Sequence, residues 1–137
     1  MKDGRDKPAS KSAERPVLIM VTAGGRNDAE RIGEGLVEGR LAACCTVIPM
    51  VHSFYYEDGQ LKREHESLLL IKTVESRGQA VQEYVRANHS YEVPEIIQIA
   101  IESGSPAYIQ WLADQVSVPS TDLPLNALDS GVGGDGS

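Results

Sequence analysis

The chain has 137 residues, 41% of them hydrophobic, and a formal net charge of −7 at pH 7. This length fits one domain, and the negative charge argues against a nucleic-acid partner, which would require a basic surface. No apolar run approaches the length that spans a membrane, so membrane insertion is not expected. The N-terminal segment is charged and contains no apolar core of a secretory signal, which predicts a cytoplasmic location.

Both ends of the chain are polar and show no hydrophobic periodicity. Residues 1–15 and 117–137 are therefore predicted to be disordered tails, with a single domain over residues 16–116. The two cysteines, Cys44 and Cys45, are adjacent, and neighbouring cysteines rarely bridge each other. Reduced thiols are expected, which also suits the cytoplasm.

The first elements of the domain are a strand and a helix. The continuous apolar run VLIMV at residues 17–21 predicts a buried strand. Asn27 is a predicted helix cap, with Glu30 three residues later as its capping-box partner. Apolar residues then recur at helical spacing until Gly39, a plausible helix end.

Residues 42–73 show no helical period and predict two long strands joined by a hairpin. Asp58-Gly59 is the turn signal, and Pro49 predicts an edge position, a bulge or a bend in the first arm. Arms of this length overhang a small sheet and leave strand edges unpaired. Part of each arm is therefore expected to pair with another chain.

The second half of the domain is predicted to contain a helix, a strand and a last helix. Ser76 is a predicted cap for a helix that ends near Asn88, and residues 96–102 predict a strand buried on both faces. Ser105 caps a last helix with Pro106 in its first turn. The predicted fold class is α+β: a ferredoxin-like split βαβ antiparallel sheet with an extra C-terminal helix.

A titratable stretch directly precedes the last predicted strand. It begins HSYEVPE and places His89, Tyr91, Glu92 and Glu95 within seven residues. Because this stretch leads directly into a predicted buried strand, it would hold these side chains rigidly at the edge of the core. The alternative is a loop with solvated carboxylates and an incidental histidine.

This stretch, continued as HSYEVPEII, resembles the signature of the CutA family of divalent-cation-tolerance proteins. Further segments match the family in the right order: LAAC followed by Ile48-Pro49, SFYY followed by Gly59, Ile71-Lys72-Thr73, and a closing helix with Trp111. The likeness covers about residues 16–116. It implies a ferredoxin-like domain that assembles as a tight homotrimer. The unpaired hairpin edges alone allow a closed assembly with either twofold or threefold symmetry. The resemblance favours the assembly of three subunits.

The resemblance also implies a polar cavity between subunits, rimmed by residues of the matched segments. The residues assigned to this binding cavity are Lys72, Tyr91, Glu95, Glu66 and Tyr55. The family's association with divalent metals implies copper, or zinc, as the ion bound. The residues assigned to the metal are His89, Cys44 and Glu92. Imidazole and thiolate suit such ions, but no ligand spacing such as CxxC is present, so the fold or the subunits must assemble the site.

The expected function is therefore divalent-metal tolerance or response by metal-ion binding, without enzyme activity. The alternative is a trimeric small-molecule sensor, similar to the nitrogen-regulatory PII proteins, with its ligand in the inter-subunit cleft. An enzyme that uses Lys72, Tyr91 and Glu95 ranks third. His52 and His65 lie at similar distances from the turn and are possible cross-strand neighbours. Two facing histidines can hold a metal, but neither matches a family motif, and both are left out of the site.

Overall fold

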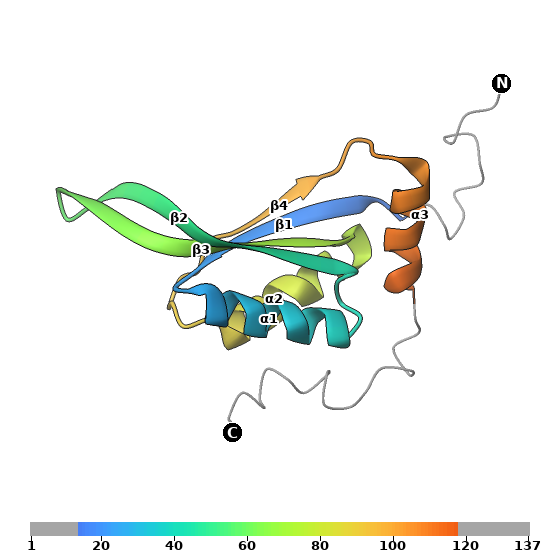
Figure 1. Ribbon diagram of the computed structural model, residues 1–137, viewed down its shortest axis with the longest axis horizontal. Coiled ribbons are helices and arrows are strands. Elements are labelled where there is room, and N and C mark those ends of the chain that lie inside the picture. The colour runs from blue at the N-terminus through green and yellow to red at the C-terminus, as the bar shows by residue number, and fades with distance from the viewer. Residues whose placement is uncertain (1–13, 118–137) are drawn as a thin grey trace.

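The computed structural model describes residues 14–117, which form a four-stranded sheet and three α-helices (Figure 1). Most of the two predicted tails, residues 1–15 and 117–137, lies outside the described residues. The elements in chain order are β1 (Pro16–Ala23), α1 (Arg26–Glu38), β2 (Cys44–Glu57), β3 (Gln60–Val74), a 3₁₀ turn η3 (Glu75–Arg77), α2 (Gly78–Asn88), β4 (Ile96–Ala100) and α3 (Pro106–Gln115).

The strands lie in the order β2-β3-β1-β4, and every neighbouring pair is antiparallel. The first strand is thus central, between β3 and β4, while β2 and β4 form the two edges. This order, with both main helices on one face of the sheet, is the predicted split βαβ arrangement (Figure 1). The α+β fold prediction is confirmed.

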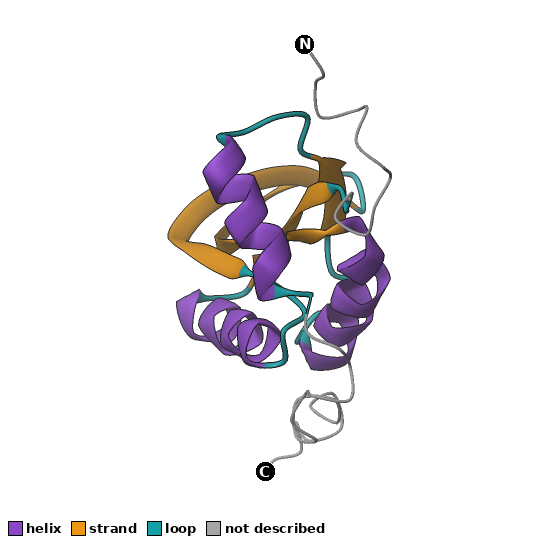
Figure 2. Ribbon diagram, turned by 90° about the vertical axis from the view of Figure 1, so that its right-hand side faces the viewer, coloured by secondary structure: helices purple, strands orange, loops and turns teal. Residues whose placement is uncertain are grey.

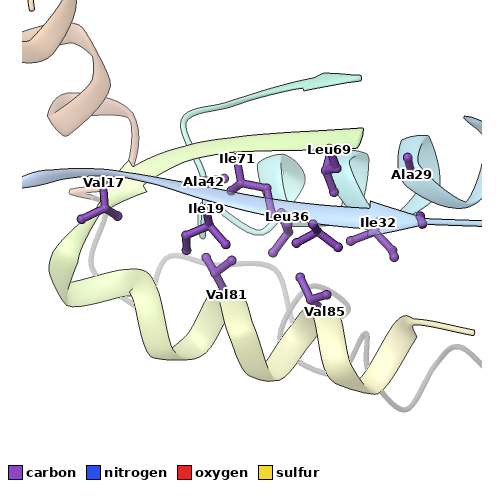
Figure 3. Close-up of a cluster of buried hydrophobic side chains, with 12 residues drawn as sticks. Val17, Ile19, Ala29, Ile32, Leu36, Ala42, Leu69, Ile71, Val81 and Val85 are labelled. Carbon is purple, nitrogen blue, oxygen red and sulfur yellow. The ribbon is translucent and has the colours of Figure 1, made fainter. Parts of the chain in front are cut away.

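The main core lies between the sheet and helices α1 and α2. Because side chains alternate along a strand, every second residue of β1 and of the inner half of β3 points at the helices, and these residues are apolar apart from the buried Ser67 and Thr73. Figure 3 shows Val81 of α2 directed toward Ile19, and Val85 of α2 directed toward Leu36 and Ile32 of α1. All five side chains are at most 1% exposed, so the helices seal this face of the sheet.

The opposite face of the sheet is apolar and largely uncovered. Met20 of β1 lies between Leu70 of β3 and Ile97 of β4, and the next row places Leu18 beside Ile99. Helix α3 stands across one end of the sheet (Figures 1 and 2), where Leu112 packs in a small second core. A contiguous apolar face of this kind marks an interaction surface.

The prediction that the last strand is buried on both faces is wrong for this chain by itself. Its outward residues Ile97 and Ile99 are 46% and 44% exposed, because β4 is an edge strand and nothing within the described residues covers that face. The apolar run in the sequence of β4 therefore includes residues of a sheet face that is uncovered in the single chain.

Two predicted helix caps are also wrong. Helix α1 begins at Arg26 with Gly25 at its N-cap, so Asn27 already lies inside the helix. The turn η3 occupies residues 75–77, which delays α2 to Gly78 and leaves Ser76 outside it. The third cap is confirmed: the Ser105 hydroxyl accepts a hydrogen bond from the backbone N–H of Tyr108, at 3.3 Å.

The long hairpin has the predicted turn and the predicted irregularity. Asp58 and Gly59 have φ values of 55° and 76°, the left-handed conformation that two-residue hairpin turns require. The register between β2 and β3 shifts between Ile48 and Val51, so Pro49 lies in a β-bulge of an edge strand. Beyond the bulge the hairpin extends well past helix α1 (Figure 1).

Candidate functional site

A polar groove lies where the hairpin leaves the body of the sheet. It has a volume of about 570 Å³ and collects residues from β1, β2, β3 and the loop between α2 and β4. Its lining residues are Thr22, Ser53, Phe54, Tyr55, Glu57, Glu64, Glu66, Tyr91, Val93 and Glu95. Segments far apart in the sequence therefore meet at this point.

Two tyrosine hydroxyls organise the carboxylates of the groove. The Tyr91 hydroxyl donates a hydrogen bond to Glu66 Oε2 at 2.9 Å, which ties the loop to strand β3. The Tyr55 hydroxyl donates a longer bond of 3.4 Å to Glu64 Oε2 across the hairpin. Glu64 and Glu66 share a face of β3 because they are two residues apart.

His89 fixes the loop that presents Tyr91. Its Nε2 lies 2.7 Å from the carbonyl oxygen of Thr22, and its Nδ1 lies 3.0 Å from the backbone nitrogen of Tyr91. A carbonyl can only accept and a backbone N–H can only donate, so Nε2 carries the proton and Nδ1 accepts. Both ring nitrogens are therefore engaged, and neither has a lone pair left for a metal.

The groove favours positive charge. Four glutamates line it and no lysine or arginine does, among the residues that the structure describes. Partial burial, followed by the hydrogen bond to Glu66 and its negative charge, raises the pKa of Tyr91 from 10.0 to about 12. Desolvation and then the charges of Glu64 and Glu57 also raise the pKa of Tyr55. Both phenols stay protonated at neutral pH and act as hydrogen-bond donors.

The raised pKa of Tyr91 makes its contribution to stability depend on pH. The native state holds the phenol proton more tightly than the unfolded chain, so this contribution is complete below pH 10 and is lost as pH rises toward 12. We expect Tyr91→Phe to lower the free energy of unfolding by about 1 kcal/mol at pH 8, because one hydrogen bond to a carboxylate is lost. That difference should shrink between pH 10 and pH 11.5 in denaturant titrations.

Tyr56→Phe is the matched control, because the Tyr56 side chain is exposed and its hydroxyl makes no hydrogen bond with any residue from 14 to 117. Its stability should follow that of the wild type at every pH. A Tyr91→Phe deficit that stayed constant up to pH 11.5 would contradict the assignment.

Four of the five residues predicted for the binding cavity meet in this groove: Tyr55, Glu66, Tyr91 and Glu95. Lys72 does not. It lies six residues from Glu66 along β3, about 20 Å away at ~3.3 Å per residue, and donates a hydrogen bond to Thr46 Oγ1 at 2.8 Å. A single chain therefore does not assemble the Lys72–Tyr91–Glu95 arrangement considered for an enzyme.

The single chain also does not bring together His89, Cys44 and Glu92, the residues predicted for the metal. Cys44 pairs with Lys72 at the far end of the sheet, while His89 is bound to Thr22 and Glu92 is exposed in the loop. Within residues 14–117, no three His, Cys, Asp or Glu side chains lie close enough to hold one ion.

The thiol of Cys45, next to Cys44, packs against the core. Burial is the largest cause that raises the pKa of Cys45 from 9.0 to about 12, and the adjacent Cys44 adds to it. The thiol therefore stays protonated at neutral pH, as expected for a packed structural residue. As alternation along a strand predicts, Cys45 faces helix α1, packed near Gly33, and Cys44 takes the other face.

Sequence reasoning missed several groove residues, notably Glu64, Ser53 and Thr22. The turn at Asp58-Gly59 fixes the hairpin register, which places Ser53 opposite Glu64, and strand alternation then adds Glu64 to the face of Glu66. Those two rules, applied together, would have found this pair. Nothing in the local sequence of Thr22 indicates that its carbonyl oxygen accepts a hydrogen bond from the His89 ring.

Comparisons with known proteins give one consistent result. A family model described as "CutA1 divalent ion tolerance protein" matches residues 17–115. The chain is 47% identical over 96 residues to a CutA homolog of Xenopus laevis, a match that covers 70% of this chain and only 64% of the frog protein. It is 36% identical over 96 residues to the divalent-cation tolerance protein CutA of Pectobacterium atrosepticum, covering 70% of this chain and 87% of that protein.

The fold agrees with this relationship. The crystal structure of CutA1 from Oryza sativa matches this structure with a TM-score of 0.75 at 32% sequence identity. The match covers 80% of this chain and 100% of the rice chain. No helix among residues 14–117 is long and apolar enough to cross a membrane.

Proposed function

Because the chain belongs to the CutA1 family of divalent ion tolerance proteins, we propose that it acts in divalent-cation tolerance as a homotrimer that binds the cation directly. The ion would enter the acidic groove at the base of the hairpin. The observation that carries the proposal is the set of four glutamates lining a groove that contains no basic side chain among the described residues. The protein is a binding protein in this proposal and carries out no chemical step.

The carboxylates of Glu64, Glu66 and Glu95 would supply the negative charge, with the two tyrosine hydroxyls orienting Glu64 and Glu66. Since no three donors converge within residues 14–117, one chain would hold the ion loosely, with water completing its coordination. Further ligands would come from a neighbouring subunit. Copper and zinc are the ions that we propose, and carboxylates also accept harder cations.

The homotrimer is supported by the uncovered apolar face of the sheet. Met20, Leu70 and Ile97 form a row on that face, and burying it against two further copies would remove it from water. Lys72 and Cys44 lie toward the same face, so the proposed trimer would enclose them as well. Any role of Lys72 in the cavity would require a groove on a neighbouring subunit.

A small-molecule sensor is the second candidate function, and the apolar part of the groove favours it. The 85% exposed Val93 lines the same groove as the carboxylates. An organic cation would use both kinds of surface, whereas a metal ion would use only the oxygens. The two functions are therefore distinguished by the ligand that the groove prefers.

Calorimetric titration of Cu²⁺ into the wild type and into the double variant Glu66→Gln/Glu95→Gln tests the proposal. We expect at least one class of binding sites to weaken tenfold or more in the double variant, which corresponds to about 1.4 kcal/mol. Glu83→Gln on α2 is the matched control, because it removes an exposed carboxylate outside the groove. Its titration should match that of the wild type.

Identical titrations for the wild type and the double variant would refute cation binding in the groove. Spermidine, titrated in the same way, represents an organic cation. Tight binding of spermidine that depends on Glu66 and Glu95, together with unchanged copper binding, would favour the sensor.

A further inference from the structure

The outer half of the hairpin carries two histidines that face each other. His52 of β2 and His65 of β3 are direct partners in the antiparallel register, so their side chains lie on the same face. Their ring centroids are 4.5 Å apart and the rings are tilted by 31°. Both side chains are exposed. The two imidazoles are thus held side by side by the backbone of two strands.

The β-bulge at Pro49 creates this pairing. Before the bulge, Ile48 lies opposite Leu68, and a continuation of that register would place His52 opposite Glu64. The extra residue shifts the register by one, so that His52 meets His65 instead. Without the bulge the imidazoles would lie on opposite faces of the hairpin.

The ring nitrogens of the pair are available, in contrast to those of His89. No hydrogen bond or ion pair joins His52 or His65 to another residue in the described range, apart from their mutual ring contact. In His89, by comparison, both ring nitrogens form hydrogen bonds with the backbone, one with Thr22 and one with Tyr91. Among the histidines of this chain, only this pair can offer two lone pairs to one ion.

We propose that His52 and His65 form a two-histidine site on the hairpin for a borderline divalent cation, such as Cu²⁺ or Zn²⁺. Metal–nitrogen bonds of about 2.0–2.1 Å place two ligating nitrogens roughly 3 to 4 Å apart, which rings with this separation reach by side-chain rotation. Water would fill the other positions. Neutral imidazole favours borderline ions over Mg²⁺ or Ca²⁺, which prefer oxygen.

This site is separate from the acidic groove. Strand alternation puts His65 on the opposite face of β3 from Glu64 and Glu66. The neighbouring pair on the face of the histidines is Phe54 and Arg63, whose guanidinium lies 4.8 Å from the ring centroid of Phe54. The two-histidine site can therefore be tested independently of the function proposed for the groove.

Copper titration followed by electron paramagnetic resonance tests this proposal, because nitrogen and oxygen ligands give different spectra. In the full-length protein with the groove double variant Glu66→Gln/Glu95→Gln, we expect a signal from two coordinated nitrogens. Adding His52→Gln or His65→Gln should each abolish that signal and weaken copper binding at least tenfold. The two substitutions combined should cost little more than either alone, since one remaining histidine cannot chelate.

Arg63→Gln is the control for a general disturbance of the hairpin, and it should leave the nitrogen signal intact. Circular dichroism verifies that each variant is folded. Copper spectra and affinities that are unchanged by both histidine substitutions would overturn the two-histidine site, whatever the groove binds. Copper binding that the glutamate substitutions leave unchanged, together with an intact histidine signal, would instead count only against the groove.

Discussion

Ile97→Glu is expected to break the proposed homotrimer of 14.8 kDa chains into single folded chains. Ile97 lies in the middle of the uncovered apolar face, next to Met20 of the central strand, and is 46% exposed in the single chain. In the proposed trimer each copy would bury an unpaired carboxylate, which costs several kcal/mol per subunit. Light scattering after gel filtration measures the mass directly.

Val37→Glu is the matched control for this experiment. Val37 belongs to helix α1 in the other layer and is 36% exposed, so the same change of charge is made away from the uncovered face. This control should keep the mass of three chains. If Ile97→Glu also retained that mass, the sheet face would not be the interface. Circular dichroism distinguishes a folded single chain from an unfolded one.

Leu36→Ala is expected to destabilise the protein by about 2–5 kcal/mol, the usual cost of removing a large aliphatic side chain from a packed core. Leu36 is fully buried between the sheet and helix α2, among the side chains drawn in Figure 3. Alanine is the best helix former, so the loss reflects the cavity and not the helix. Urea unfolding should show a clearly lower midpoint.

Val37→Ala provides the comparison, because it truncates the next residue of the same helix at a position 36% exposed to solvent. Its cost should stay within about 1 kcal/mol, as expected for a partly exposed aliphatic residue. Both variants must be measured at one protein concentration, since assembly adds to the apparent stability. Equal losses for the two variants would contradict the location of the core.

The fold could be predicted from periodicity and turn chemistry. The apolar runs, the Asp58-Gly59 turn and the Ser105 cap each indicate a local structure that the chain adopts. Helix starts were predicted less well, because a glycine before α1 and a 3₁₀ turn before α2 replaced the expected side-chain caps at Asn27 and Ser76. A capping motif reports that a helix begins nearby and does not fix its first residue.

The grouping of residues in the groove was predicted in part, while their role in binding stays a prediction. Tyr91, Glu66, Glu95 and Tyr55 meet because the loop after α2 crosses the end of β1 and reaches the hairpin. The grouping of Lys72 with them followed from matched motifs, which carry no information on distance along a strand. His89 was selected as a metal donor by residue type, and sequence alone cannot reveal that its nitrogens bind the backbone. The cytoplasmic location and the homotrimer stay predictions.

The central place of β1 has a consequence for synthesis of the chain. Its strand partners are residues 67–74 and 96–100, so β1 leaves the ribosome long before either can pair with it. At roughly 5 to 20 residues per second, about 4 to 15 s separate the completion of β1 from that of β4. During that interval an apolar strand of high β-propensity has two unsatisfied edges. A nascent chain arrested before β4 would thus keep one side of β1 open to aggregation.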